Sequence, residues 1–481
     1  MWDTKEIGTV EDVRESIVVV SGLASCMSGQ IIDFKDGAKG MIIGFNENES
    51  SVLIFTDKER VEPKDKVVSK LQNFMVPVGQ NFLGRIINAL GEPLDKKGAI
   101  EEENFYPVFK EAAAILDREI IEELLETGIK IIDSVIPIGK GQRELIIGNR
   151  ITGKTSLTTD VILNQKGKDV ICVYCCIGKS LFDVGRTIQL LEESGALNYT
   201  IVLLAGAQAS VGEQYLAPYT AASVGEYFMR QGKDVLVVFD DLTNHARTYR
   251  EISLLLERYP GRDAYPGDIF YIHSQLMEKA GKLKAKLGAG SMTFLPIVET
   301  LEGDVTGYIP SNLISMTDGQ IYLNSALFNE GFRPAVDLKL SVSRIGNKVQ
   351  SPIMRELTAK LRLEYIQYLE LRRLTKIKAG MSEEIENKLK RGEAIEHLFI
   401  QDKNKPVSLA GQIILLYALK RGLLDDLNKM VLGKVKNEIF DFTLKYNPDL
   451  IKKITQKTYL DENIEKGLVD ITEQFFLKEK I

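Results

Sequence analysis

The sequence predicts a multidomain chain of 481 residues with three regions of different fold class. Short apolar runs broken by turn residues at the amino end predict an N-terminal β-barrel. Apolar runs that alternate with helical patterns predict a central α/β domain with a parallel sheet, and helical patterns alone predict a C-terminal α-helical bundle. A single hydrophobic core rarely exceeds about 250–300 residues, so a chain of this length is expected to divide. We place the three domains at residues 1–73, 74–350 and 351–481.

The composition argues against two broad classes of protein. The formal net charge of −6 does not favour a general nucleic-acid binder. No apolar stretch is long enough to span a membrane, and the start at Met1 lacks the pattern of a signal peptide. We therefore expect a cytoplasmic protein, or one that lies peripherally on the cytoplasmic face of the cell membrane.

Three of the four cysteines lie in one apolar run, at Cys172, Cys175 and Cys176. A Cys-x-x-Cys metal or redox site would need a second pair of ligands, and neighbouring residues of a strand point to opposite faces. No such pair and no nearby histidine follow, so we expect reduced cysteines in the core. The three histidines of the chain are too scattered to indicate a metal site.

Four short runs in the first domain predict strands, at residues 16–20, 30–34, 40–45 and 51–55. Turn residues at 36–37 and 46–50 separate them. We expect a small closed barrel that serves assembly and carries no chemistry.

The middle region alternates predicted strands with predicted helices. Such alternation specifies a parallel sheet covered by helices, with ligands at the carboxyl ends of the strands. The predicted strands are Val170–Ile177, 200–204, 235–239 and 292–298, and the predicted helices include Leu181–Glu193, 213–230 and 243–257.

The motif that organises the chain is Gly-x-x-x-x-Gly-Lys-Thr at residues 148–155, which follows an apolar strand pattern and precedes a helical one. This is the setting of a phosphate-binding P-loop, although a glycine turn could match by chance. Backbone N–H groups and the start of the helix would face phosphate oxygens, Lys154 would reach the terminal phosphates, and the Thr155 hydroxyl would bind Mg²⁺. The predicted phosphate-binding residues are Gly148, Asn149, Arg150, Ile151, Thr152, Gly153, Lys154, Thr155 and Ser156.

A magnesium-nucleotide site also needs a carboxylate on a neighbouring strand. The apolar run 235–239 ends in Asp240 and Asp241, and we predict that Asp240 supports Mg²⁺. An acid in this place is otherwise often a helix N-cap, a role that suits Asp241.

After residue 350 the strand patterns stop. Helical patterns cover residues 354–377, 383–390, 394–399 and 408–420, with several more to the end of the chain. We expect a helical bundle whose charge pairs form a solvated face.

With the order barrel, P-loop domain and bundle, the chain resembles the alpha subunits of the F-type rotary ATP synthase head. Residues 127–143, 214–219, 260–268 and 314–320 carry the likeness, which covers nearly the whole chain. The resemblance implies ATP or ADP with Mg²⁺ as ligands, and a ring of three alpha-type and three beta-type subunits around a gamma-type rotor. It also implies a non-catalytic site in this chain and a part in ion transport, with membrane contact only through the complex.

The resemblance further assigns Arg344, supported by Ser341 and Ser343, as an arginine finger for the catalytic site of the adjacent beta-type subunit. A fixed guanidinium near the γ-phosphate stabilises charge as the P–O bond breaks, and such residues contribute about 10³ to 10⁵ in rate. From the residues alone, a solvated or structurally paired arginine would be the default interpretation.

Lys179 gives a chemical reason to expect slow turnover in this chain. Catalytic beta-type relatives place a glutamate there to orient and deprotonate water, whereas an ammonium is a poor base. We expect Lys179 to help hold the γ-phosphate instead. Around the base, the resemblance assigns Phe328, Arg333, Pro334, Gln401 and Lys403.

The chain departs from the alpha-subunit pattern at four nucleotide positions, Asn149, Ile151, Lys179 and Lys403. It also enters its barrel almost at once, so we expect no secure docking of a peripheral stalk. A short link between residues 165 and 170 should trim a surface loop. These features indicate a divergent F-type-like head, and they leave open whether it works as an ATP synthase or as an ATP-driven motor.

Three other functions are alternatives for a chain with these motifs. A self-sufficient homohexameric export-type ATPase shares this architecture and would need Asp183 or Glu213 in place of the missing glutamate. A purely structural ring member would keep nucleotide only as a folding ligand. An RNA-translocating hexamer is disfavoured by the acidic balance and the lack of a basic, aromatic surface stretch.

Overall fold

The computed structural model describes residues 5–55, 61–375, 382–456 and 459–479. The chain forms two compact units, which are described separately. Unit 1 comprises Met1–Ile120, Lys140–Leu145 and Lys166–Thr317, and unit 2 comprises Ile121–Gly139, Ile146–Gln165 and Asp318–Ile481. Met1, where we place the start of the first domain, lies outside the described residues. The domain boundaries at residues 73 and 350 stay predictions.

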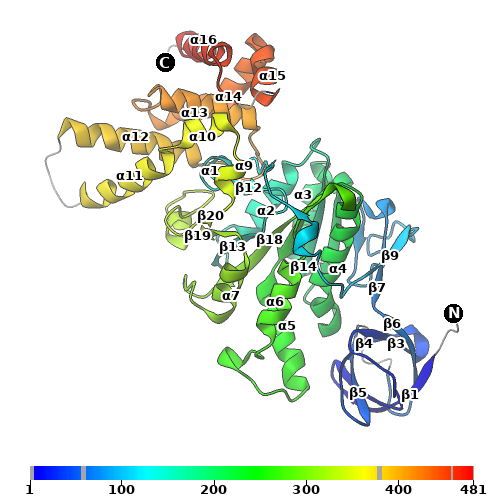
Figure 1. The fold of residues 1–481 in the computed structure, drawn as a ribbon. Coiled ribbons are helices and arrows are strands. Elements are labelled where there is room, and N and C mark those ends of the chain that lie inside the picture. Colours follow the sequence, from blue (N-terminus) through cyan, green and yellow to red (C-terminus); the bar gives the residue numbers. More distant parts are fainter. Residues whose placement is uncertain (1–4, 56–60, 376–381, 457–458, 480–481) are drawn as a thin grey trace. The chain divides into compact units, whose positions relative to one another are not determined.

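The predicted β-barrel is confirmed in unit 1 (Figure 1). Six antiparallel strands close in the order β1-β2-β5-β4-β3-β6, and β6 pairs back onto β1. Its core is mostly buried valine and isoleucine. The sequence patterns located four strands and missed the first and the last. The six strands are β1 (Glu6–Arg14), β2 (Ile17–Ser21), β3 (Gln30–Phe34), β4 (Lys39–Phe45), β5 (Glu49–Ile54) and β6 (Lys66–Asn73).

Unit 1 also contains the parallel sheet expected in the middle of the chain. Neighbouring strands run in the order β18-β16-β14-β15-β8, all parallel, and their residues are almost fully buried, as in a sheet covered on both faces. A short strand, β17 (Gly281–Leu283), runs antiparallel beside β18. The five parallel strands are β8 (Ile86–Ile87), β14 (Val170–Ile177), β15 (Thr200–Ala205), β16 (Asp234–Asp240) and β18 (Ser291–Thr300).

Helices in unit 1 begin where the sequence supplies N-cap side chains. Ser180, Ser210 and Asp241 each accept a hydrogen bond from the backbone three residues later, which satisfies a donor at the helix start. The N-cap interpretation of Asp241 is therefore confirmed. The helices are α3 (Leu181–Glu193), α4 (Val211–Arg230), α5 (Leu242–Leu255), α6 (Ile269–Met277) and α7 (Tyr308–Met316).

The cysteines of β14 are core residues, as expected. Cys172, Cys175 and Cys176 have no exposed area, and their thiols are free. Two histidines of unit 1, His245 and His273, are also completely buried. Neither group forms a metal cluster among the residues that the structure describes.

Unit 2 contains the P-loop segment and two strands that accompany it. The end of β13 (Glu144–Asn149) leads into the loop, and α2 (Lys154–Leu163) follows it. β19 (Gly319–Leu323) pairs antiparallel with the short strand β20 (Val342–Ser343). Other short elements here are α1 (Lys130–Val135), β11 (Leu124–Leu125), β12 (Ile138–Gly139), α8 (Ser325–Asn329) and α9 (Gly346–Val349).

The carboxyl-terminal part of unit 2 is helical, but three predicted helices were wrong in extent. The pattern at 354–377 is two helices that break near Ala359, and its end lies outside the described residues. Conversely, 383–390 and 394–399 form one continuous helix. α11 and α12 lie side by side in Figure 1. The helices are α10 (Pro352–Thr358), α11 (Leu361–Thr375), α12 (Glu383–Phe399), α13 (Leu409–Lys420), α14 (Lys429–Tyr446), α15 (Pro448–Gln456) and α16 (Glu462–Glu479).

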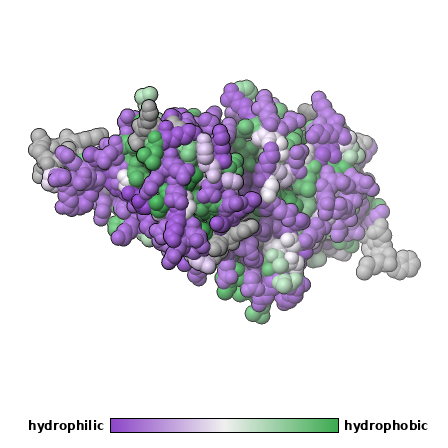
Figure 2. Space-filling view, turned by 90° about the horizontal axis from the view of Figure 1, so that it is seen from above, coloured by the Kyte–Doolittle hydropathy of each residue, from purple (hydrophilic) through white to green (hydrophobic). Residues whose placement is uncertain are grey.

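The surface carries hydrophobic residues among polar ones. Figure 2 shows a face on which hydrophilic residues predominate and hydrophobic residues occur between them. Within the described ranges, the model contains no helix with the length and apolar character needed to cross a membrane.

Candidate functional site

The P-loop in unit 2 has the backbone that its sequence predicts. Gly153 adopts a left-handed conformation with φ of 95°, which only glycine adopts at low cost, and α2 begins at the next residue. A Cβ atom at Gly148 would lie 2.5 Å from the carbonyl oxygen of Leu323, so this position has no room for a side chain. The loop therefore passes close to β19 and presents the N-terminus of α2, the arrangement that binds phosphate.

The polar side chains of the loop stabilise its turn. The Lys154 ammonium donates to the carbonyl oxygens of Gly148 at 3.0 Å and Asn149 at 2.6 Å. The hydroxyl of Thr152 donates to the Asn149 carbonyl at 2.8 Å, and the Asn149 amide donates to the Ser325 hydroxyl at 2.9 Å. The cation is thus held at the loop, where an incoming phosphate could replace the carbonyls as its partner.

The other predicted loop residues differ in exposure. Thr155 is half-buried, whereas Arg150 and Ser156 are exposed. Ile151 adopts a left-handed φ of 65° and is 80% exposed, so its side chain does not contribute to the core.

Two residues assigned to the base lie beside the P-loop. The ring of Phe328, on α8, is the nearest group to the position that a Cβ atom would take at Gly153, at 3.9 Å. The Arg333 guanidinium lies 4.6 Å from the centre of that ring. A flat aromatic ring with a stacked guanidinium suits a purine, and the adjacent Pro334 is half-buried.

Gln401 is close to this group, but its side chain is largely engaged. The backbone N–H of Gln401 donates to the Arg333 carbonyl at 2.7 Å. Both amide hydrogens donate to backbone, at Gly128 (2.8 Å) and Lys405 (2.9 Å), and the amide oxygen accepts from the Lys130 N–H at 3.1 Å. Gln401 therefore fixes the segment, and only the second lone pair of its oxygen stays available to a base.

The exposed Lys403 belongs to a turn that α2 holds in place. The Asn404 N–H donates to the Asp160 carboxylate at 2.7 Å, and burial raises the pKa of Asp160 to about 6. The positive charge of Lys403 lies close enough to Asp160 to offset part of this rise in its pKa.

The segment that carries Arg344 is fixed by the two predicted serines. Ser341 accepts from the Tyr322 N–H at 2.9 Å, and Ser343 donates to the Pro137 carbonyl at 2.7 Å. The Arg344 N–H donates to the Asp318 carbonyl at 3.0 Å, and its side chain is on the surface. These contacts fix the backbone at the residue that carries the exposed arginine side chain.

In unit 1, Lys179 and Asp240 form an ion pair at the carboxyl ends of the neighbouring strands β14 and β16. The Asp240 side chain is completely buried, and its second oxygen accepts from the Tyr174 hydroxyl at 2.8 Å. Burial by itself would lower the pKa of Lys179, but the attraction of Asp240 holds it above its ordinary value. The ammonium is therefore charged at neutral pH and does not act as a base.

The neighbouring acid, Asp241, is committed to the start of α5. Its carboxylate accepts from the Asn244 N–H at 2.8 Å. Burial, followed by repulsion from Asp240, raises the pKa of Asp241 to about 6.

The two acids considered as replacements for a catalytic glutamate have structural partners. Asp183 accepts from the Ser180 hydroxyl at 2.7 Å, and its N–H donates back to that serine. The Glu213 N–H donates to Ser210 at 3.1 Å, and its carboxylate accepts from the Asn88 amide at 3.3 Å. Both acids occupy first-turn positions of helices, where negative charge is stabilising.

The predicted magnesium residues fit that ion only in part. The hydroxyl of Thr155 at the start of α2 is a suitable oxygen ligand. Asp240 is not the unpaired carboxylate that a magnesium ion and its waters require, because it already pairs with Lys179. The joint action of Thr155 and Asp240 on Mg²⁺ stays a prediction.

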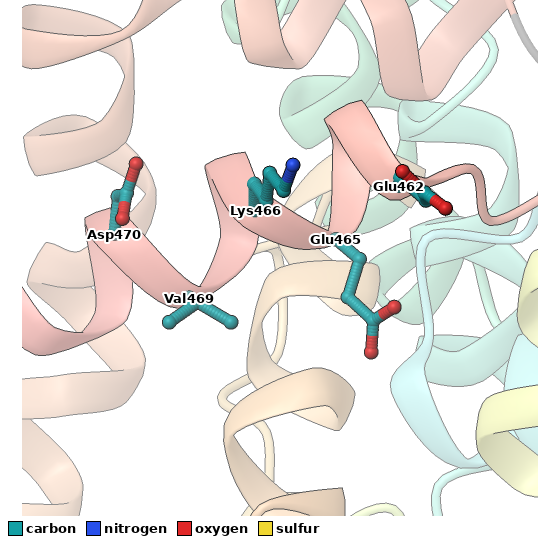
Figure 3. Close-up of a pocket in the computed structure, with 5 residues that line it drawn as sticks. All are labelled: Glu462, Glu465, Lys466, Val469 and Asp470. Carbon is teal, nitrogen blue, oxygen red and sulfur yellow. The ribbon is translucent and has the colours of Figure 1, made fainter.

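A shallow hollow on α16 lies outside all of these groups. Figure 3 shows its lining side chains, which come from a single helix: Glu462, Glu465, Lys466, Val469 and Asp470. They include neither an aromatic ring nor a glycine-rich turn, so the hollow has no feature of a nucleotide site.

Several supporting residues carry no signal in the sequence. Tyr174 lies within a uniformly apolar strand, and Ser325 stands in an ordinary helix start. Arg362, which donates to the Ser341 carbonyl at 2.9 Å, is one of many arginines. Their roles depend on long-range packing, which local patterns do not record.

Comparison with known proteins finds relatives that match nearly the whole chain. The model of the ATP synthase alpha/beta family nucleotide-binding domain matches residues 128–343, that of the family's β-barrel domain matches 3–70, and that of its C-terminal domain matches 350–475. The chain is 44% identical to the ATP synthase subunit alpha of Clostridium acetobutylicum, over 98% of this chain and 94% of that protein. It is 43% identical to the subunit alpha of Petrotoga mobilis, over 98% and 95% of the two chains.

Proposed function

The chain belongs to the ATP synthase alpha/beta family, and from this premise we propose that it is a non-catalytic, nucleotide-binding alpha-type subunit of a rotary ATPase head. In this role it binds ATP or ADP at residues 148–156 and contributes an arginine finger to the catalytic site of a neighbouring beta-type subunit. The complex couples ATP synthesis or hydrolysis to rotation and ion transport.

The observation that carries the proposal is the ion pair of Lys179 and Asp240. A catalytic site needs a group that accepts a proton from the attacking water. A charged ammonium has no lone pair for that proton, and Asp183 and Glu213 are engaged at helix starts. A site of this chemistry binds nucleotide without rapid turnover.

The rigid segment around Arg344 supports the second half of the proposal. Ser341 and Ser343 fix the backbone just before Arg344, and the arginine side chain lies on the surface of this chain. A fixed backbone restricts the positions that this guanidinium can take when it meets a γ-phosphate on another subunit.

The proposed assembly contains three alpha-type and three beta-type subunits around a gamma-type rotor. The beta-type neighbour supplies the catalytic site, and the membrane is reached only through the rest of the complex. We place the head in the cytoplasm, peripheral to the cytoplasmic face of the cell membrane. Mg²⁺ would accompany the nucleotide with Thr155 as ligand and would contribute charge neutralisation at the phosphates.

Steady-state ATP hydrolysis of the purified chain, alone and mixed with its beta-type neighbour, tests the proposal. We expect an inert chain, an active mixture, and a loss of about 10³ or more in rate when Arg344→Ala replaces the wild type in the mixture. Arg421→Ala is the matched control, because the Arg421 side chain forms an exposed ion pair with Glu473 at 3.8 Å.

Two outcomes would contradict the proposal. Hydrolysis by the chain alone at the rate of the mixture would favour the homohexameric ATPase. An unchanged rate with Arg344→Ala would leave a structural ring member as the better account.

A further inference from the structure

Arg362, the second residue of α11, holds the segment of unit 2 that leads to Arg344. One nitrogen of its guanidinium, Nη2, donates to the carbonyl oxygens of Leu338 at 2.7 Å and Ser341 at 2.9 Å. The Arg362 side chain is half-buried, and the side chain of Leu338 is buried. The arginine therefore joins the start of a helix to the chain three to six residues before Arg344.

The segment 338–341 has no regular strand partner for its carbonyl groups. β20 is only two residues long and begins after this segment. Carbonyl groups that are removed from water need hydrogen-bond donors. Distant side chains supply them here: Arg362 donates to two of the carbonyls, and the Gln320 amide donates to that of Leu340 at 3.1 Å. Side chains from β19 and α11 therefore set the path of the chain toward Arg344.

The packing of α11 fixes the origin of the Arg362 side chain. The residue before it, Leu361, is 2% exposed, and Tyr365, one helical turn later, is 1% exposed. The centre of the Tyr365 ring lies 5.7 Å from that of Phe399 on α12 and 6.3 Å from that of Phe332. A guanidinium that starts from a packed helix restrains the two carbonyls more closely than one on a mobile stem.

We propose that Arg362 is a positioning residue for Arg344: it fixes the backbone from which the Arg344 guanidinium reaches a γ-phosphate on the neighbouring subunit. The inference rests on the proposed function of Arg344 as an arginine finger. Arg362 acts through the backbone, because its Nη2 donates to two backbone carbonyls. Without this restraint the Arg344 guanidinium is displaced, and a displacement of about 1 Å costs about 100-fold in rate.

A merely structural contact would have a different consequence. It would stabilise the fold of unit 2 and leave the turnover of the assembled head unchanged. A double-mutant cycle distinguishes the two roles, because a residue that acts only through Arg344 has no effect on the rate once the Arg344 side chain has been removed.

The test is steady-state ATP hydrolysis by the full chain mixed with its beta-type neighbour. We expect Arg362→Ala to lower kcat about 10- to 100-fold with an unchanged KM for ATP. In a chain that already carries Arg344→Ala, the same substitution should change the residual rate by less than about twofold.

Two further variants sharpen the test. Arg362→Lys keeps the charge and a nitrogen with enough hydrogens for both carbonyls, so it should recover part of the lost rate. Arg391→Ala is the matched control, because Arg391 is a half-buried arginine of α12 that donates to the Leu419 carbonyl, away from the segment 338–341. Its removal should leave kcat unchanged.

An unchanged kcat for a folded Arg362→Ala chain overturns the inference, as does an equal loss of rate with and without the Arg344 side chain. If Arg362→Ala does not fold, Arg362→Gln, which has a shorter and neutral side chain, is measured in both backgrounds against the same criteria. Failure of the proposed function is a separate result, in which Arg344→Ala alone leaves the rate of the mixture unchanged and overturns both.

Discussion

The two buried histidines of unit 1 predict a loss of stability in mild acid. His245 stacks on Tyr215 with ring centres 5.6 Å apart, and its Nε2 lies 3.1 Å from the Tyr215 carbonyl oxygen. The His273 ring lies 6.1 Å away, and its Nδ1 is 3.2 Å from the Asn312 amide. His245 Nδ1 and His273 Nε2 have no hydrogen-bond partner among the described residues, so neither ring has a carboxylate to stabilise a charge.

Burial lowers the pKa of His245 from 6.5 to about 4 and that of His273 to about 3, with His245 as a further cause for His273. Above pH 6.5 both rings are neutral in the folded and unfolded chains, and the stability is complete. As the pH falls below 6.5, only the unfolded chain takes up protons, so stability is lost until the pH reaches the folded pKa. The full loss is about 3 kcal/mol for His245 and about 5 kcal/mol for His273, of which about 2 kcal/mol each appears by pH 5.

Urea unfolding followed by far-UV circular dichroism at pH 8 and pH 5 measures this effect. The variants His245→Gln and His273→Gln do not titrate, so each should reduce the difference between the two pH values by about 2 kcal/mol. His397→Gln is the comparison for a less buried ring: that ring is half-buried and burial lowers its pKa by less, so this variant should reduce the difference less than the other two. Buried carboxyl groups with a raised pKa, such as Asp160, increase the stability of the folded chain as the pH falls. They are present in the wild type and in all three histidine variants, so they cancel in the comparison. If both variants keep the wild-type pH dependence, the reasoning from burial is refuted.

Three further predictions concern unit 2. Asp133→Ala removes a buried carboxylate that accepts four hydrogen bonds, so we expect the free energy of unfolding to fall by about 3 kcal/mol or more. The control, Asp402→Ala, removes an exposed carboxylate and should lower the free energy of unfolding by less than about 1 kcal/mol. Gly148→Ala places a Cβ atom 2.5 Å from a backbone oxygen and should weaken ATP binding at least about tenfold in calorimetry, while an unchanged affinity would show that the loop adapts. Ser343→Ala frees the turn beside Arg344 and should slow hydrolysis by the mixture about tenfold with unchanged ATP binding to this chain; equal rates would mean that the serine does not position the arginine.

Sequence patterns located the parallel sheet well because its strands are buried on both faces and therefore consist of continuous apolar runs. Every residue of β14 is buried, and the apolar run that predicted it has the same bounds as the strand. The barrel strands β1 and β6 were missed because half of their buried positions hold a non-apolar residue, Gly8 in β1 and Ser69 in β6, so the apolar alternation is weak. The break between α10 and α11 was missed because the apolar spacing continues through it, and only packing decides where the first helix ends.

The sequence by itself determined the P-loop, the order of the domains and the family, because these depend on residue types at fixed spacing along the chain. The tertiary structure decided which partners those residues have. It pairs Lys179 with Asp240 across two strands, engages the amide of Gln401 with backbone, and fixes the turn at Arg344 through Ser341. Such contacts join residues far apart in sequence, and only the folding of the chain brings them within hydrogen-bonding distance.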